Sequence, residues 1–226
     1  MPYTLDYKYE NFAYTARFEK PVLELWGAGA TVTKGMYDAY LPFNVPLSNF
    51  QVGGPATNAA EPIVTVKLGD IGTARFAFDR TESSFANFSE EAFQTIPRLL
   101  AASTDWLRSS TKTFKIASHH LLYSNHSLLK EGSPAEFLKT VNARSFSDAG
   151  ESIGNGAIFN HVRRDVGWQT QLILDRSLSV NGGLFVSFGI VLDSDKIDYS
   201  WLFLEGRKYF ETMLGDLGLR LPEPSI

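Results

Sequence analysis

One structural unit occurs twice in this sequence and constrains the fold more than any motif does. Each copy has a strand pattern, a glycine turn, a second strand pattern and a long helical pattern, in residues 63–109 and again in 168–217. With Leu68 aligned on Leu178, the two copies correspond without a gap. The matching order and spacing predict two related strand–turn–strand–helix units. An internal duplication is one hypothesis for their origin.

Further strand patterns occupy the N-terminal part of the chain. Residues 3–9 alternate apolar and polar side chains, and residues 12–18 do so again, which predicts two half-buried strands. Residues 22–26 continue in an extended pattern. We expect the glycines within 27–29 to relieve a bend in a strand, because they lack the third glycine of a dinucleotide-binding turn.

The C-terminal part contains two hairpin signals. Residues 157–164 and 168–174 predict one hairpin, with a glycine in the turn between them. Residues 184–192 are apolar at nearly every position, which is typical of a strand buried on both faces. The dipeptide Asn181-Gly182 before this strand is a favoured two-residue hairpin turn.

Three helices are expected. Ser89 is a suitable N-cap for a helix that continues to about residue 109, and Pro97 should kink this helix or begin a second one. Ser133 opens a short helix as its N-cap, with proline at the first helical position. The last helix covers about 198–214.

Residues 42–62 contain several prolines and a glycine pair, which break both the helical and the strand periodicity. The sequence therefore predicts a loop of about twenty residues, which is long for a compact domain. The loop is either a lid over a binding site or a wrapping segment. In the second case its apolar side chains would anchor it, and these are Phe43, Leu47, Phe50 and Val52.

Together these patterns predict an α+β fold. We expect a mainly antiparallel, twisted sheet packed by two long helices. Residues 1–226 would form a single domain built of two halves, about 1–110 and 111–226. This length suits one large domain.

Composition excludes several classes of function. The net charge is −4 and no segment is strongly basic, so we expect neither nucleic acid nor a membrane surface as a partner. The chain has no cysteine, which rules out disulfides, thiolate nucleophiles and cysteine-ligated metals. Neither a signal-peptide pattern nor an apolar run of about 20 residues is present, so we expect a soluble cytoplasmic protein.

The histidines are the first candidates for a functional site. His119 and His120 should point to opposite faces of a strand, so they cannot chelate one ion together. His120 and His126 share a face but lie about 20 Å apart in an extended chain. We therefore expect no metal site, and we interpret most of these histidines as hydrogen-bonded side chains of a partly exposed sheet.

The hairpin near residue 165 gives a second candidate site. His161 and Arg163 share one face of the strand, and an arginine there could grip a carboxylate or phosphate in a bidentate way. The alternative is a solvated turn with local ion pairs. The candidate ligand-binding residues are His120, His161, Arg163 and Trp168.

No motif for a cofactor, a nucleophilic serine or a zinc protease occurs, so no cofactor is expected. The expected function is that of a non-catalytic binding or interaction protein, self-associating or bound to a protein partner. One alternative is a binder of a small apolar ligand, with its pocket between sheet and helices and residues 42–62 as the gate. Another is an enzyme that uses His120, His161 and Arg163.

Overall fold

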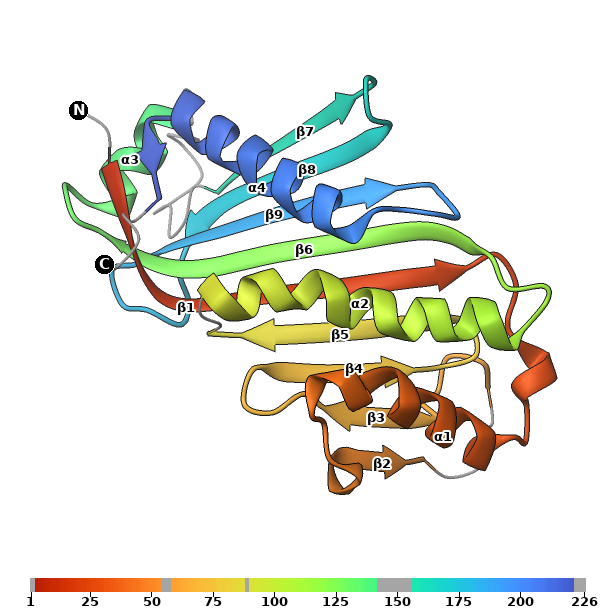
Figure 1. Cartoon of the computed structure of the whole chain (residues 1–226). Helices are drawn as coiled ribbons and strands as arrows, with labels where there is room; N and C mark the ends of the chain where they lie inside the picture. The colour runs from red at the N-terminus through yellow and green to blue at the C-terminus, as the bar shows by residue number, and fades with distance from the viewer. Residues whose placement is uncertain (1–2, 54–57, 88–89, 142–155, 222–226) are drawn as a thin grey trace. The chain divides into compact units, whose positions relative to one another are not determined.

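The computed structural model describes residues 3–53, 58–87, 90–141 and 156–221. The described residues form an α+β fold with one open, mostly antiparallel sheet, as the sequence predicts (Figure 1). The strand order is β2-β3-β4-β5-β1-β6-β9-β8-β7, and β10 pairs in parallel with β1. The strands are β1 Tyr3–Phe18, β2 Phe50–Val52, β3 Val64–Lys67, β4 Gly72–Phe76, β5 Arg80–Ala86, β6 Ile116–Leu129, β7 Ala157–Arg163, β8 Trp168–Arg176, β9 Leu184–Leu192 and β10 Leu219–Arg220. The α-helices are α1 Gly29–Tyr40, α2 Glu90–Ser110, α3 Pro134–Val141 and α4 Tyr199–Asp216.

Contacts divide the chain into two compact units that alternate along the sequence. The first unit contains Met1–Asn11, Leu122–Ile190 and Leu204–Ile226, and the second unit contains Phe12–Leu121 and Val191–Phe203. The boundaries between them fall within elements rather than in linkers. The expected halves, about 1–110 and 111–226, stay a prediction about domain organisation.

In the second unit, the antiparallel strands β2 to β5 follow one another, and α1 and α2 lie side by side against them (Figure 1). The α2 helix is continuous through Pro97. The side chains of Ile96 and Leu100 on this helix are buried together with Phe76 and Phe85 from the sheet. The apolar stripe of α2 predicted this packing.

The first copy of the predicted repeat contains one strand more than the second. The sequence predicted two strands before α2, whereas the structure has three, β3, β4 and β5. The gapless alignment places β5 on residues 190–196, of which only the first three belong to a strand. The additional strand breaks the one-to-one match of elements, and the internal duplication is not confirmed.

β1 is one strand, not the two that the alternation predicted. The buried side chains change phase along it, from the odd-numbered Leu5 to the even-numbered Phe12, Tyr14, Ala16 and Phe18. A change of phase between residues 5 and 12 resembles a strand break in the sequence, because successive side chains point to opposite faces of a sheet. The strand itself continues from the first unit into the second.

The expected strand over 22–26 and the bend after it are also wrong. Leu23–Leu25 is a single 3₁₀ turn, and Gly29 begins the helix α1. Val32, Met36 and Tyr40 repeat every four residues and are all fully buried, which is the helical signal in this segment.

The segment 42–62 is more ordered than the predicted loop. It contains the short strand β2, which pairs with β3, and residues 54–57 of it lie outside the described residues. Phe50 packs edge-on against Tyr37, with 5.7 Å between ring centroids. Leu47 and Val52 are 60% and 58% exposed, so neither of them anchors the segment.

In the first unit, the predicted hairpin and the predicted short helix are both present. β7 and β8 pair as a hairpin, and Gly167 in its turn has a φ of +71°. Ser133 and Glu136 hydrogen-bond each other's backbone N–H groups, which is the capping box of α3. Leu184, Val186, Phe188 and Ile190 bury one face of β9, whereas the other face is only partly covered, in contrast to the prediction.

Asp198 caps α4 by accepting a hydrogen bond from the Trp201 N–H at 3.0 Å, as the predicted start of the last helix implies. Within the first unit, Phe210 of this helix stacks on Phe188, with 5.2 Å between ring centroids. None of the described helices is long and apolar enough to span a membrane.

Gly35 sets the distance between α1 and α2. A Cβ atom at this position would overlap the indole ring of Trp106, which itself packs against Phe76. We expect Gly35→Ala to lower the free energy of unfolding by about 1–3 kcal/mol, because overpacking outweighs the roughly 1 kcal/mol gain in helix propensity. Urea denaturation measures this change. The control is Gly29→Ala in the same helix, where a Cβ meets no atom within 4 Å, and it should not destabilise the protein.

Candidate ligand pocket

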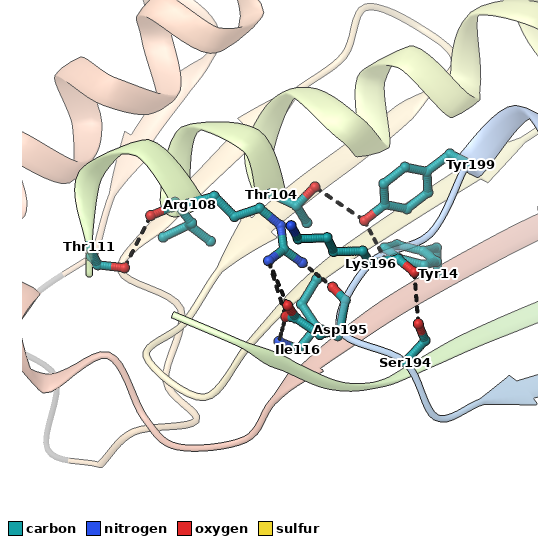
Figure 2. A network of polar contacts seen from close by, with 10 residues as sticks. Tyr14, Thr104, Arg108, Thr111, Ile116, Ser194, Asp195, Lys196 and Tyr199 are labelled. Atoms are coloured by element: carbon teal, nitrogen blue, oxygen red, sulfur yellow. Dashed lines mark hydrogen bonds and ion pairs between the residues drawn. The ribbon is translucent and has the colours of Figure 1, made fainter. Parts of the chain in front are cut away.

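The second unit contains a pocket of about 210 Å³ next to the last turns of α2. The start of β6, the segment 193–198 and the first residue of α4 complete its wall (Figure 2). Most of the lining side chains are polar or charged, and the lining residues are Thr104, Asp105, Arg108, Ile116, His119, Asp195, Lys196, Ile197 and Tyr199. The pocket therefore differs in character from the apolar cavity that the sequence suggested.

His119 occupies the buried wall of this pocket and has no exposed surface. Its Nδ1 atom lies 2.7 Å from the Tyr14 hydroxyl, and that hydroxyl lies 2.9 Å from the Tyr199 hydroxyl. Tyr199 in turn donates to Thr104 Oγ1 at 3.1 Å (Figure 2). A buried chain of hydrogen bonds thus connects β6, β1, α4 and α2 within one unit.

One set of hydrogen-bond directions that fits these contacts assigns a tautomer to His119. Thr104 donates to the carbonyl oxygen of Ala101 at 3.0 Å, because a carbonyl can only accept. In this set the Tyr199 hydrogen goes to Thr104 and the Tyr14 hydrogen goes to Tyr199. His119 then donates from Nδ1 to Tyr14, and Nε2 keeps its lone pair.

The Nε2 atom is buried and makes no hydrogen bond within the described residues. Burial lowers the pKa of His119 to about 4, although the nearby carbonyl of Ser194 acts in the opposite direction. Burial also raises the pKa of both Tyr14 and Tyr199, so both hydroxyls stay protonated and able to donate. At neutral pH the pocket therefore presents an uncharged histidine whose Nε2 atom has no partner within the described residues.

An ion pair supports the other side of the pocket. Arg108 donates to both carboxylate oxygens of Asp195 at 3.1 Å and also to its backbone carbonyl (Figure 2). The same carboxylate accepts the Ile116 N–H at 2.9 Å. Burial alone would raise the pKa of Asp195, but this N–H and the Arg108 guanidinium hold it below its usual value. The segment 193–198 is thereby attached to both α2 and β6.

Two charged residues line the exposed part of the pocket. Asp105 and Lys196 are both exposed to solvent, in contrast to the buried Thr104, His119 and Tyr199. Within the described parts of the chain, Lys196 forms no ion pair at 4 Å or closer. The pocket thus combines a buried, uncharged wall with a charged opening.

The predicted site residues lie outside this pocket. In the second unit, the His120 ring hydrogen-bonds Ser118 Oγ at 2.9 Å, and partial burial lowers its pKa. In the first unit, Arg163 pairs with Asp165 and lies 5.4 Å from the Trp168 ring centroid. His161 is exposed on the same strand. The structure brings Arg163 and Trp168 together, and it places His120 in the other unit.

The candidate residues predicted from the sequence do not include those of the pocket. His119 was expected only to point away from His120, which is correct, since it is buried while His120 is partly exposed. His119 lies two residues before Leu121, so both side chains point to the same face of the strand. This alternation could have identified His119 as a buried residue. Tyr14, Tyr199 and Asp195 carry no comparable signal, because their contacts join segments far apart in the sequence.

Comparison of the sequence with models of protein families gives no match, and comparison with curated proteins gives none either. Within the described residues, no three His, Asp or Glu side chains lie close enough together to hold a metal ion. The geometry of the pocket is therefore the evidence for what this unit can bind.

The Tyr14 hydroxyl joins two buried partners, so its loss should be costly. We expect Tyr14→Phe to lower the free energy of unfolding by about 1–3 kcal/mol, because His119 Nδ1 and the Tyr199 hydroxyl lose their common partner. Chemical denaturation followed by circular dichroism measures the difference. As a control, Tyr9→Phe on the same strand changes a side chain that is 50% exposed and should stay within about 0.5 kcal/mol of the wild type.

The lowered pKa of His119 predicts a pH-dependent stability. The unfolded chain protonates this histidine near pH 6.5, whereas the folded chain does so only near 4. The contribution of neutral, buried His119 to the free energy of unfolding should therefore be fully present above pH 6.5. It should fall by about 3 kcal/mol as the pH drops toward 4 and stay constant below that pH. Unfolding measured at several pH values tests this.

In His119→Gln this contribution should disappear, so the variant loses less stability than the wild type between pH 6.5 and 4. His120→Gln is the matched control, because His120 is only partly buried and its removal should leave most of the slope. An unchanged slope in His119→Gln would show that another group causes the acid sensitivity.

Proposed function

We propose that the second unit binds a compact, hydrogen-bond-donating anion in the pocket beside His119, and that the chain acts as a binding protein. The observation that carries the proposal is a buried histidine nitrogen, Nε2, that has no partner among the described residues and lies in the wall of a pocket also lined by Lys196, which forms no ion pair among them. Buried polar atoms in native proteins usually have a partner, so an unused one suggests a missing molecule.

Lys196 supports the anionic part of the proposed ligand. Its charge is not matched by an ion pair in the described residues, whereas the Arg108 charge is matched by Asp195. A carboxylate or phosphate at the opening would provide the missing partner and would gain a charge-assisted hydrogen bond. Asp105 in the same wall would favour a ligand that also carries a hydroxyl or amino group, because a carboxylate only accepts.

His119 supports the hydrogen-bond donor of the proposed ligand. With the ring hydrogen on Nδ1, its Nε2 lone pair can accept from a hydroxyl or amine but cannot bind another acceptor such as an ether or a carbonyl. The ring is fully buried, so a ligand group reaches Nε2 only if the segment 193–198 gives way slightly or a bound water connects the two.

The size of the pocket limits the ligand. A volume of 210 Å³ lies below the roughly 300–1,000 Å³ typical of pockets for drug-sized molecules. A small hydroxy acid or a phosphorylated fragment fits such a volume, whereas a lipid or a dinucleotide does not. The apolar ligand suggested by the aromatic composition is correspondingly a weaker candidate.

The chemistry of the pocket favours binding over catalysis. An efficient general base has a pKa near the working pH, and His119, with a pKa of about 4, holds a proton too weakly for that role at pH 7. Tyr14 and Tyr199 hold their protons too tightly to supply a base instead. An enzyme based on His120, His161 and Arg163 has less support, since Arg163 is already paired with Asp165.

Thermal unfolding with increasing concentrations of single compounds tests the proposal. We expect lactate and glycerol phosphate, which carry both an anion and a hydroxyl, to raise Tm more than acetate or glycerol. A ligand at ten times its Kd should add about 1.4 kcal/mol to the stability of the folded state. Equal responses to all four compounds would contradict a specific site.

Two lysine variants show whether the stabilisation by these compounds arises in the pocket. Lys196→Gln should abolish most of the stabilisation by lactate and glycerol phosphate, because it removes the charge at the opening. Lys20→Gln removes an equally exposed charge from the same unit, outside the pocket, and should respond like the wild type. If both variants respond alike, the anions act through general ionic effects and the proposal fails.

A further inference from the structure

The two ends of the sheet differ in how well they are protected against pairing with another chain. β2 has only three residues, and short edge strands offer little backbone for pairing. β7 has seven residues, is the last strand of the sheet and pairs with β8 in one continuous register. In the described part of the chain, β8 is the only strand that pairs with β7, so the backbone groups on its other side remain available.

The side chains of β7 do not protect this edge. The strand has no proline and no lysine, and it contains no bulge against β8. Ile158 and Val162 are 62% and 66% exposed, and they point to the same face of the sheet. An open, regular edge with exposed β-branched residues is the type of surface that extends a sheet into another chain.

We propose that a second copy of this chain pairs with β7, antiparallel to it, about a twofold axis at Asn160. In this register each Ile158 faces Val162 of the partner subunit, and Asn160 faces its own copy. The interaction is independent of the pocket beside His119, since β7 belongs to the first unit.

The strand sequence is complementary to itself in this register. The two exposed aliphatic side chains of one strand meet those of the other, and such cross-strand pairs stabilise a sheet. Arg163 is the only charged residue of the strand, and it faces Ala157 of the partner subunit, so no like charges meet. The Asn160 side-chain oxygen already accepts from Gln171 at 2.9 Å, and its amide N–H groups can donate across the axis. A closed, twofold pairing also leaves no further copy of this edge open.

Seven paired residues on each side bury less than the roughly 1,200 Å² of a standard stable interface. We therefore expect a dimer whose population rises with protein concentration.

Cysteine crosslinking tests the register directly, because the chain contains no cysteine. In an antiparallel pair, residues directly opposite each other have Cα atoms about 4.5–5.5 Å apart, which lies within the range a disulfide spans. We expect Asn160→Cys to form a disulfide-linked dimer under mild oxidation, measured by non-reducing electrophoresis.

Two control cysteines distinguish this register from other contacts. In the Ile158→Cys variant, the cysteine of one subunit faces position 162 of the other subunit. The two cysteines are therefore about 14 Å apart along the strands and should not crosslink. Leu178→Cys, at a fully exposed position outside β7, measures random collisions. Crosslinking of Asn160→Cys that is no faster than that of Leu178→Cys, or preferred crosslinking of Ile158→Cys, would overturn the proposal.

Sedimentation of the cysteine-free chain gives an independent measurement. Val162→Lys should raise the dimer dissociation constant about tenfold or more, because each interface contains the change twice. Leu178→Lys adds the same charge elsewhere in the first unit and should leave the dimer unchanged. A wild-type chain that stays monomeric at all concentrations would exclude the paired edge.

Discussion

The Asp195 carboxylate is the point at which three parts of the second unit meet. It accepts hydrogen bonds from the Arg108 guanidinium and the Ile116 N–H, so the end of α2, the start of β6 and the segment before α4 are held together by one side chain. Removing this carboxylate would take an acceptor from both Arg108 and the Ile116 N–H, and an unsatisfied buried donor costs more than the net value of one hydrogen bond. The position of Tyr199, and with it the closure of the polar chain to His119, depends on this junction.

The arrangement around His119 is a compromise between burial and polarity. Protein interiors tolerate polar groups when every donor has an acceptor, and three hydroxyls satisfy this condition by donating in one direction. The chain ends at the Ala101 carbonyl, whereas the other ring nitrogen of His119, Nε2, has no hydrogen-bond partner in the described residues. A fully apolar wall would be simpler to build, so the retained acceptor is easier to understand as part of a binding surface than as part of the core.

Much of the fold could be predicted from periodicity, whereas the site could not. The α+β class, the capped helices and the β7–β8 hairpin follow from local signals such as Ser133 before Glu136. The errors in β1 and α1 arose where local signals were ambiguous, namely a change of side-chain phase and a glycine at the first position of a helix. The pocket depends on partners distant in sequence, such as Tyr14 and Tyr199, and no local pattern encodes such a pair.

The alternation of the two units along the chain has a consequence for synthesis. Residues 12–121 emerge from the ribosome early and contain almost all of the second unit, including the strands β2 to β5 and the helices α1 and α2. Asp195 and Tyr199, however, belong to the late segment Val191–Phe203. Asp195 is synthesised 87 residues after its partner Arg108, and Tyr199 is synthesised 185 residues after its partner Tyr14. Closing such long loops is entropically expensive and slow. During translation the second unit therefore exists for a time as a nearly complete scaffold whose polar centre is still open.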